Sequence, residues 1–367
     1  MRTTRTHLLL TLVLSFIVWT GCMESPRSTS APMQRAEEQP GAATAPAPAV
    51  ALRDGMLVVE GRPYDIRGIC WNPIPKGLSH PEGLPFVTGG AAYDLAFVER
   101  DLRLIAEAGF NTLRPYEVID DEKVLDLIES YGLKVIVPLF NFHQRTIEQV
   151  QADLSALMRH PTTLFWEIGN EWNYNNFYNP EGNFEDSAER IQEVITAIKS
   201  SGNTLPVALN YGELPTRQIE QRFDVDIWGL NIYRSDDFRD VFEQWETVSD
   251  KPMYIGEYGA DAIDNRNGDG LYVPQAQAYA VETLTRQIVA QYASRGRGPA
   301  LGGALFEFSD EWWKDGSGLP TEHDIGGIAP GGGPYPDLEF NEEWWGIVDV
   351  ERNPRAAYHA MKALYGP

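Results

Sequence analysis

The sequence predicts an α/β fold, a (β/α)8 barrel of the TIM type in a single domain. Two observations predict it: eight short apolar runs recur along the chain, and each is followed by a longer stretch with helical periodicity. The runs are continuous in Val, Ile and Leu, as expected for parallel strands covered on both faces. A doubly wound open sheet is the alternative, but no glycine-rich phosphate loop follows the first run. The eight runs begin at Tyr64, Asn111, Leu133, Thr163, Leu205, Val225, Pro252 and Ala300.

The segments between the runs carry helix signals. Residues 94–109 open on Asp94, a residue typical of a helix N-cap, and stop at Gly109. Residues 187–202 and 276–296 repeat this pattern. Two further elements are expected at the ends of the domain. A β-hairpin centred on Gly61 should close the bottom of the barrel, and residues 344–366 should supply a last short strand and a closing helix.

The first 51 residues differ from the rest. Residues 1–21 combine two arginines with a short apolar run and predict a secretory signal peptide. Cys22 follows Thr20 and Gly21, which resembles the lipobox of bacterial lipoproteins and predicts lipidation of Cys22; an ordinary signal with an incidental cysteine is the alternative. Residues 22–51 are rich in Pro, Ala and Ser and predict a disordered tether. The folded domain is therefore expected over residues 52–367, exported and held at a membrane only through this lipid anchor.

The charge of the chain restricts its partners. The formal net charge is −23, which repels phosphate backbones and acidic polymers, so nucleic acid is not an expected partner and a neutral ligand is favoured. Cys70 lies between Ile69 and Trp71 and is expected to be a small core residue. The six histidines form no HxH or HExxH group, and the loop 265–270 lacks the final glutamate of a calcium loop. The sequence predicts no metal site and no cofactor.

Polar residues gather at the carboxyl ends of the predicted strands, where barrels of this kind form active sites. Glu171 ends the fourth run and Glu257 ends the seventh, so both can point into one mouth. Hydrolysis of a glycosidic bond needs two carboxyl groups, one to protonate the departing oxygen and one to attack the anomeric carbon or activate water. Salt-bridged rim carboxylates are the alternative.

An Asn-Glu pair ending strand four, with a glutamate ending strand seven, is similar to the pattern of the clan A retaining glycoside hydrolases. The resemblance implies that Glu171 is the acid/base and Glu257 the nucleophile. It further implies that Asn170 holds the sugar 2-hydroxyl, that Arg114 supports the nucleophile, and that Tyr233 donates a hydrogen bond to it. Contacts with Arg114 and Tyr233 would favour the ionised form of Glu257, whereas an apolar setting should raise the pKa of Glu171.

The segment after the eighth run should supply an aromatic floor for the sugar, with Phe308, Trp312 and Trp313 as candidates. The remaining substrate-binding candidates on the rim are Trp71, Asn72, Tyr116, Asn141, His143, Tyr211 and Asn231.

The stretch from Ile66 to Val137 is similar to the family 72 β-1,3-glucanosyltransferases and to barrels of the family 2 and family 5 type. The expected function is that of a retaining glycoside hydrolase acting on a neutral β-linked glucan or oligosaccharide. A β-glucan transglycosylase and a non-catalytic carbohydrate-binding lipoprotein are the alternatives.

Overall fold

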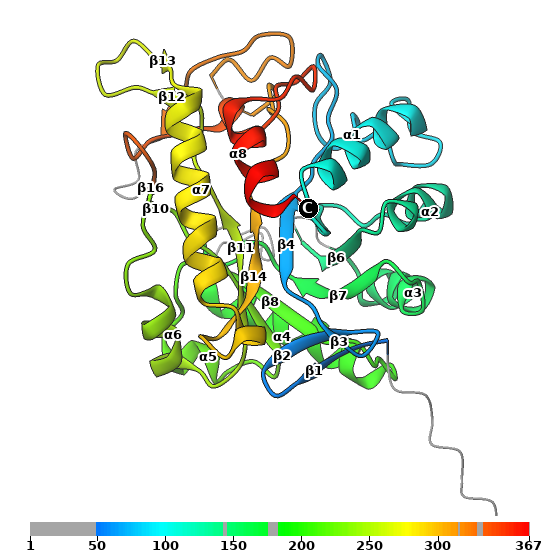
Figure 1. The fold of residues 1–367 in the computed structure, drawn as a ribbon. Helices are drawn as coiled ribbons and strands as arrows, with labels where there is room; N and C mark the ends of the chain where they lie inside the picture. The colour runs from blue at the N-terminus through cyan, green and yellow to red at the C-terminus, as the bar shows by residue number, and fades with distance from the viewer. Residues whose placement is uncertain (1–48, 142–144, 175–182, 315, 329–332, 367) are drawn as a thin grey trace, which may run out of the picture. The chain divides into compact units, whose positions relative to one another are not determined.

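Eight parallel strands form a closed barrel in the computed structural model, which describes residues 49–141, 145–174, 183–314, 316–328 and 333–366. Around the barrel they follow chain order, and the last strand pairs with the first (Figure 1). The predicted (β/α)8 fold is confirmed, and each of the eight apolar runs contains one strand. The strands are β4 (Ile66–Cys70), β5 (Thr112–Arg114), β6 (Lys134–Phe140), β7 (Thr163–Ile168), β8 (Val207–Gly212), β9 (Ile227–Asn231), β11 (Met253–Tyr258) and β14 (Ala300–Leu305).

Helices lie outside the strands, and α7 and α8 run side by side (Figure 1). The helix predicted over 94–109 is α1, which starts when Asp94 accepts hydrogen bonds from the backbone N–H groups of Ala96 and Phe97 at 3.0 and 3.1 Å. The helices are α1 (Leu95–Glu107), α2 (Glu122–Ser130), α3 (Ile147–Leu157), α4 (Phe184–Ser200), α5 (Arg217–Glu220), α6 (Val241–Val248), α7 (Pro274–Ala290) and α8 (Ala356–Tyr365), with 3-10 helices at Ala293–Arg295 and Glu342–Trp344.

Short strands decorate the two ends of the barrel. At the end where the barrel strands start, β1 (Val50–Arg53), β2 (Met56–Val59) and β3 (Arg62–Pro63) form an antiparallel sheet, which contains the predicted hairpin. The Oε1 atom of Glu60 lies 3.9 Å from the Nζ atom of Lys134 at the start of β6, so this sheet lies at the bottom of the barrel. The loops carry β10 (Arg234–Ser235), β12 (Ile263–Asp264), β13 (Leu271–Tyr272), β15 (Gly327–Ile328), β16 (Gly333–Pro334) and β17 (Phe340–Asn341).

The N-terminal boundary differs from the prediction by two residues. Val50 and Ala51 were expected in the tether, but they pair with Val59 and Val58 in the bottom sheet, and Val50 is buried. The predicted signal peptide, Cys22 and the tether up to residue 48 lie outside the described residues. Within the described part of the chain, no helix has the length and apolarity needed to span a membrane.

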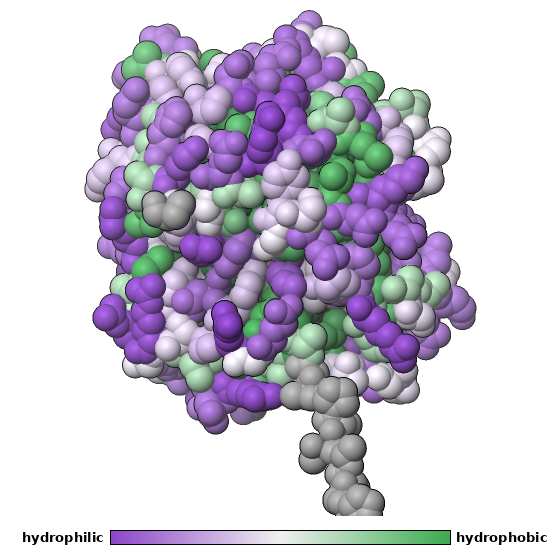
Figure 2. Space-filling view, turned by 45° about the vertical axis from the view of Figure 1, so that its right-hand side comes forward, coloured by the Kyte–Doolittle hydropathy of each residue, from purple (hydrophilic) through white to green (hydrophobic). Residues whose placement is uncertain are grey.

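The core fills the barrel and the space between strands and helices. Every residue of β5, β7, β8, β9, β11 and β14 is buried, as the continuous apolar runs predicted. Cys70 is fully buried, and burial raises the pKa of its thiol well above its ordinary value, which suits a core residue. On the face shown in Figure 2, hydrophilic residues predominate and hydrophobic ones form small patches between them.

The C-terminal segment is fastened to the barrel by two buried ion pairs. Arg352 donates to Asp101 of α1 at 3.0 and 3.1 Å, and Arg355 binds Asp310 just beyond β14. The short strand expected before α8 is reduced to single bridges that join Val348 to Ser309 and to Pro354.

Candidate active site

The turn after β7 fixes the position of Glu171. Gly169 has φ +78°, and a Cβ there would lie 2.9 Å from the ring of Trp172, so only glycine fits this turn. Glu171 itself has φ +49°, a left-handed conformation that is unusual for a residue other than glycine. The side-chain oxygen of Asn210 accepts a hydrogen bond from the backbone N–H of Glu171 at 3.0 Å and holds it there. Such strain at a polar residue in a barrel mouth is typical of functional sites.

Glu257, near the end of β11, is surrounded by donors. Arg114 Nη1 and the hydroxyl of Tyr116 donate to its Oε1 at 2.8 and 2.7 Å. The hydroxyl of Tyr233 donates to Oε2 at 2.9 Å. Because the three donors bind both carboxyl oxygens, the orientation of the Glu257 side chain is fixed. Arg114 and Tyr233 occupy the places that the resemblance implies, and Tyr116 adds a third donor.

Arg114 is the centre of the buried network. Besides Glu257, its guanidinium donates from Nε to Glu167 at 3.0 Å and from Nη2 to the side-chain oxygen of Asn170 at 2.8 Å. Burial opposes its charge, but Glu167, Tyr116 and Glu257 raise the pKa of Arg114 well above its ordinary value. Arg114 therefore connects Glu257 to Asn170, the residue that precedes Glu171.

Glu167 was missed by the sequence analysis. It lies in the middle of β7, 1% exposed, and accepts hydrogen bonds from Arg114 and from the hydroxyl of Tyr254. A glutamate inside an otherwise apolar strand run was the available signal, because a buried carboxylate needs a cation or donors.

Three asparagines form a second network beside the first. Asn231 donates to the side-chain oxygen of Asn170 at 3.2 Å, and Asn210 donates to that of Asn231 at 2.7 Å. Gly256 makes room for them, since a Cβ there would lie 2.3 Å from the amide nitrogen of Asn210. The oxygen of Asn170 is shared by Arg114 and Asn231, so the orientation of this amide is fixed.

The environment of Glu171 favours its protonated form. Burial and the charge of Glu257 raise the pKa of Glu171 to about 8, against smaller opposing effects from Asn231 and Arg114. This is the direction predicted from the sequence. At neutral pH Glu171 therefore holds a proton that it can donate to a departing oxygen.

An aromatic cluster lines the mouth next to Glu257. The ring of Tyr233 lies 5.3 Å from Trp345 and 6.4 Å from Phe306, and Phe306 lies 5.2 Å from Trp345. Trp345 was missed by the sequence analysis, which sought the aromatic floor in the segment directly after β14. Its indole nitrogen is buried with no hydrogen-bond partner among the described residues.

The remaining predicted residues fall into two groups. Trp71 and Phe308 are 0% and 1% exposed within the main core, and Tyr211 packs edge-on against Trp172 at 5.6 Å in the same core. The structure does not support their expected role in sugar binding, because their rings are buried in this core and leave no open face to a ligand. Trp312 and Trp313 are half-buried after β14 and stack on His323 and His80.

Two of the polar residues predicted to bind substrate, Asn72 and Asn141, lie at the mouth. Asn72 donates to Glu311, and Asn141 donates to the backbone oxygen of Tyr116 at 3.0 Å. The side-chain oxygen of Asn141 is buried without a partner in the described part of the chain, so it can accept from a ligand hydroxyl. His143 lies outside the described residues.

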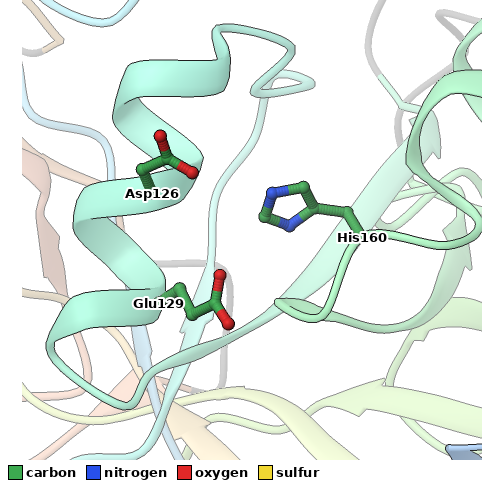
Figure 3. Close-up of side chains that lie close together, drawn as sticks. All are labelled: Asp126, Glu129 and His160. Atoms are coloured by element: carbon green, nitrogen blue, oxygen red, sulfur yellow. The ribbon is translucent and has the colours of Figure 1, made fainter.

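One group of side chains has the composition of a metal site. Asp126 and Glu129 of α2 face His160, and one ligand atom from each lies within 4.8 Å of the others (Figure 3). His160 precedes β7, so this group lies at the opposite end of the barrel from Glu171. Both carboxylates are exposed, and exposed acidic groups of this kind are common without a metal. In loop 265–270, Asn265 is bound to Glu339 and closes a turn onto Gly268.

Comparisons with known proteins agree with this geometry. Residues 140–312, slightly under half of the chain, match the family described as glycosyl hydrolases family 2, TIM barrel domain. The chain is 23% identical over 244 residues to the β-glucuronidase of Mus musculus and 22% identical over 241 residues to that of Homo sapiens. These matches cover 60% and 58% of this chain but only 35% and 34% of the relatives, so the chain spans about a third of their length.

Solved structures share the fold. A GH2 β-galacturonidase from Eisenbergiella tayi bound to galacturonate superposes with a TM-score of 0.58 at 21% identity, over 86% of this chain and 54% of the other. Bacteroides uniformis β-glucuronidase 2 superposes with a TM-score of 0.60 at 19% identity, over 85% and 36%. The barrel of this protein is thus similar to the TIM barrel domain of glycosyl hydrolases family 2.

Proposed function

We propose that the protein is a retaining glycosidase that hydrolyses O-glycosyl bonds. The observation that carries the proposal is the pair formed by Glu171, after β7, and Glu257, near the end of β11. Burial and the charge of Glu257 raise the pKa of Glu171 to about 8, and three donors hold the carboxyl group of Glu257 in place. Glu171 would protonate the departing oxygen while Glu257 attacks the anomeric carbon. Glu171, now a carboxylate, would then activate the water that releases the sugar from Glu257. Asn170, which precedes Glu171 and is held by Arg114 and Asn231, would bind a sugar hydroxyl.

We further propose a neutral β-linked sugar as the substrate. The relatives named above are β-glucuronidases and a β-galacturonidase, whose substrates carry a carboxylate. A carboxylate needs a cation, and the cations near the mouth in the described residues are engaged: Arg114 with Glu167 and Glu257, Arg234 with Glu213, and Lys314 with Glu311 and Glu342. The sequence of segments 142–144, 175–182, 315 and 329–332 contains no Lys or Arg. The acidic mouth would repel a uronate.

The substrate can be identified with a panel of p-nitrophenyl β-glycosides of glucose, galactose, mannose, xylose and glucuronic acid. We expect kcat/KM for the best neutral sugar to exceed that for the glucuronide by about 10–100-fold, since a buried unpaired charge costs about 1–3 kcal/mol. NMR of the first-formed product should show the β-anomer. A faster glucuronide would overturn the neutral-sugar proposal, and an α-anomer would overturn the retaining mechanism. No turnover of any glycoside or β-glucan would leave the carbohydrate-binding alternative.

The raised pKa of Glu171 predicts the alkaline side of the pH profile. Above about pH 8 the free enzyme loses the proton that Glu171 must donate, so kcat/KM should fall about tenfold per pH unit. Glu342 contributes a negative charge that raises this pKa, so Glu342→Gln should move the alkaline limb to lower pH. The measurement is kcat/KM between pH 5 and pH 10 for wild type and variant. An alkaline limb that persists in Glu171→Ala would show that another group titrates.

Export and lipid anchoring at Cys22 stay predictions from the sequence. The resemblance to family 72 stays one too, and with it the alternative of transfer to a second sugar in place of water. Products longer than the donor, formed from a β-glucan oligosaccharide, would reveal transfer.

A further inference from the structure

An exposed tyrosine stands beside the acid/base candidate and has no role in the chemistry described so far. Tyr174 is 63% exposed, one of the most exposed large side chains of the described residues. Its backbone N–H donates to the backbone oxygen of Glu171 at 2.8 Å, so the two residues lie one turn apart. An exposed aromatic ring beside a reacting group offers a flat face on which a ligand can stack.

The position of Tyr174 is well defined. The side chain of the preceding residue, Asn173, forms two hydrogen bonds with Gly212 at the end of β8: Nδ2 donates to the backbone oxygen at 2.8 Å, and Oδ1 accepts from the backbone N–H at 2.7 Å. The tyrosine ring lies against Gly212, where a Cβ would come within 2.4 Å of its carbons. Because Gly212 has no side chain, the ring can pack against its backbone, and the rest of the ring is exposed to solvent. Pre-organised aromatic faces bind ligands at low entropic cost.

A charged pair completes the surface. Arg234 donates from Nε to Glu213 at 3.2 Å and from Nη2 to its other oxygen, and the two side chains are 21% and 36% exposed. Glu213 and Arg234 lie close enough to Tyr174 to influence the pKa of its hydroxyl, which burial, Glu213 and Glu171 raise and Arg234 lowers. The three side chains follow β8, β9 and the turn after β7. Together they offer one flat apolar face and several hydrogen-bonding groups.

The proposed chemistry decides what can bind there. Glu171 must reach the oxygen between the two sugars, so the departing sugar lies on the side of Glu171. The sugar that becomes bonded to Glu257 lies on the other side, against Tyr116 and Tyr233. We propose that Tyr174, with Glu213 and Arg234, forms the subsite for the departing or accepting sugar, a neutral pyranose stacked on the tyrosine ring. This proposal rests on the proposed function.

The same subsite would serve transfer. A hydroxyl of a sugar bound on Tyr174 attacks the anomeric carbon of the glycosyl-enzyme, the new C–O bond forms, and the ester bond to Glu257 breaks. Glu171 takes the hydroxyl proton, and Glu257 leaves as a carboxylate. Occupancy of this subsite therefore sets the ratio of transfer to hydrolysis.

The test compares two donors that share a glucosyl group. Laminaribiose, a β-1,3-linked glucose disaccharide, places its departing glucose in the subsite, whereas the fluoride ion released from β-glucosyl fluoride occupies none of it. Tyr174→Ala should lower kcat/KM for laminaribiose about 5–10-fold and leave that for the fluoride within about twofold. Tyr174→Trp should behave like wild type. Tyr131→Ala, at the opposite end of the barrel beside β6, is the control and should change neither.

Two outcomes would overturn the subsite: an unchanged kcat/KM for laminaribiose in Tyr174→Ala, or an equal fall for both donors, which would indicate a structural role. If wild type cleaves neither donor, the proposed function fails for glucosides. Calorimetric titration of laminaribiose into Glu257→Gln, with and without Tyr174→Ala, then still decides the subsite. Equal affinity in the two variants would overturn it, and about 5–10-fold weaker binding in the double variant would support it.

Discussion

Glu257→Ala should lower kcat/KM by about 10⁴-fold or more on the best substrate of the panel, because no covalent intermediate can form without the carboxylate. The control is Glu220→Ala, which removes another buried glutamate, one that binds Ser249 and Lys251 outside the mouth. It should cost stability and leave kcat/KM within about threefold of wild type. Initial rates and thermal unfolding of both variants check the prediction.

Azide separates the two glutamates. In Glu257→Ala, azide can enter the space left by the carboxylate and attack the anomeric carbon of the β-glycoside directly, which gives the α-glycosyl azide. In Glu171→Ala, azide attacks the glycosyl-enzyme from the other face and gives the β-glycosyl azide. If the two variants gave the opposite products, the roles of Glu171 and Glu257 would have to be exchanged. Normal turnover by Glu257→Ala would refute the nucleophile assignment.

Arg114→Met should damage stability and activity together. The variant leaves Glu167 buried without its cation and removes a donor from Glu257 and from Asn170. Loss of one partner of a buried ion pair costs about 3–5 kcal/mol of unfolding free energy. We also expect kcat to fall at least about 100-fold, because Glu257 and Asn170 lose their common support. Urea unfolding and kcat measure the two effects.

A second substitution distinguishes the two roles of Arg114. Adding Glu167→Gln to Arg114→Met removes the unpaired buried charge, so part of the lost stability should return. The activity should not return, because Glu257 and Asn170 still lack their donor. If kcat recovered with stability, the effect of Arg114 on activity would be only a consequence of folding.

Most of the barrel and about half of the candidate site could be predicted from the sequence. Buried parallel strands appear as continuous apolar runs, so all eight could be recognised, and strand ends place Glu171, Glu257, Arg114 and Tyr233 on one rim. The start of the bottom sheet at Val50 could not be recognised, because four residues that pair only with their neighbours resemble a tether.

The errors at the site have a common physical origin. Successive side chains near a strand end point alternately into the barrel mouth and toward the surrounding helices. Which of them point into the mouth depends on the tilt and register of the strands. Trp71 donates from its indole nitrogen to Asp101 of α1 at 3.3 Å, whereas its neighbour Asn72 donates to Glu311 beyond β14. Trp345 packs against Tyr233, 112 positions away in the sequence, and no local sequence pattern predicts this contact. The position of the Tyr174 ring depends on its packing against Gly212, a contact between distant residues that the sequence does not show.

The buried pairs of Arg352 and Arg355 have a consequence for the order in which the protein becomes functional. A ribosome completes all eight barrel strands by Leu305, and with them Glu171 and Glu257. The indole of Trp345 and the two arginines that fasten its segment are synthesised some 40 residues later. The last stretch of the chain to be synthesised therefore completes the wall next to Tyr233.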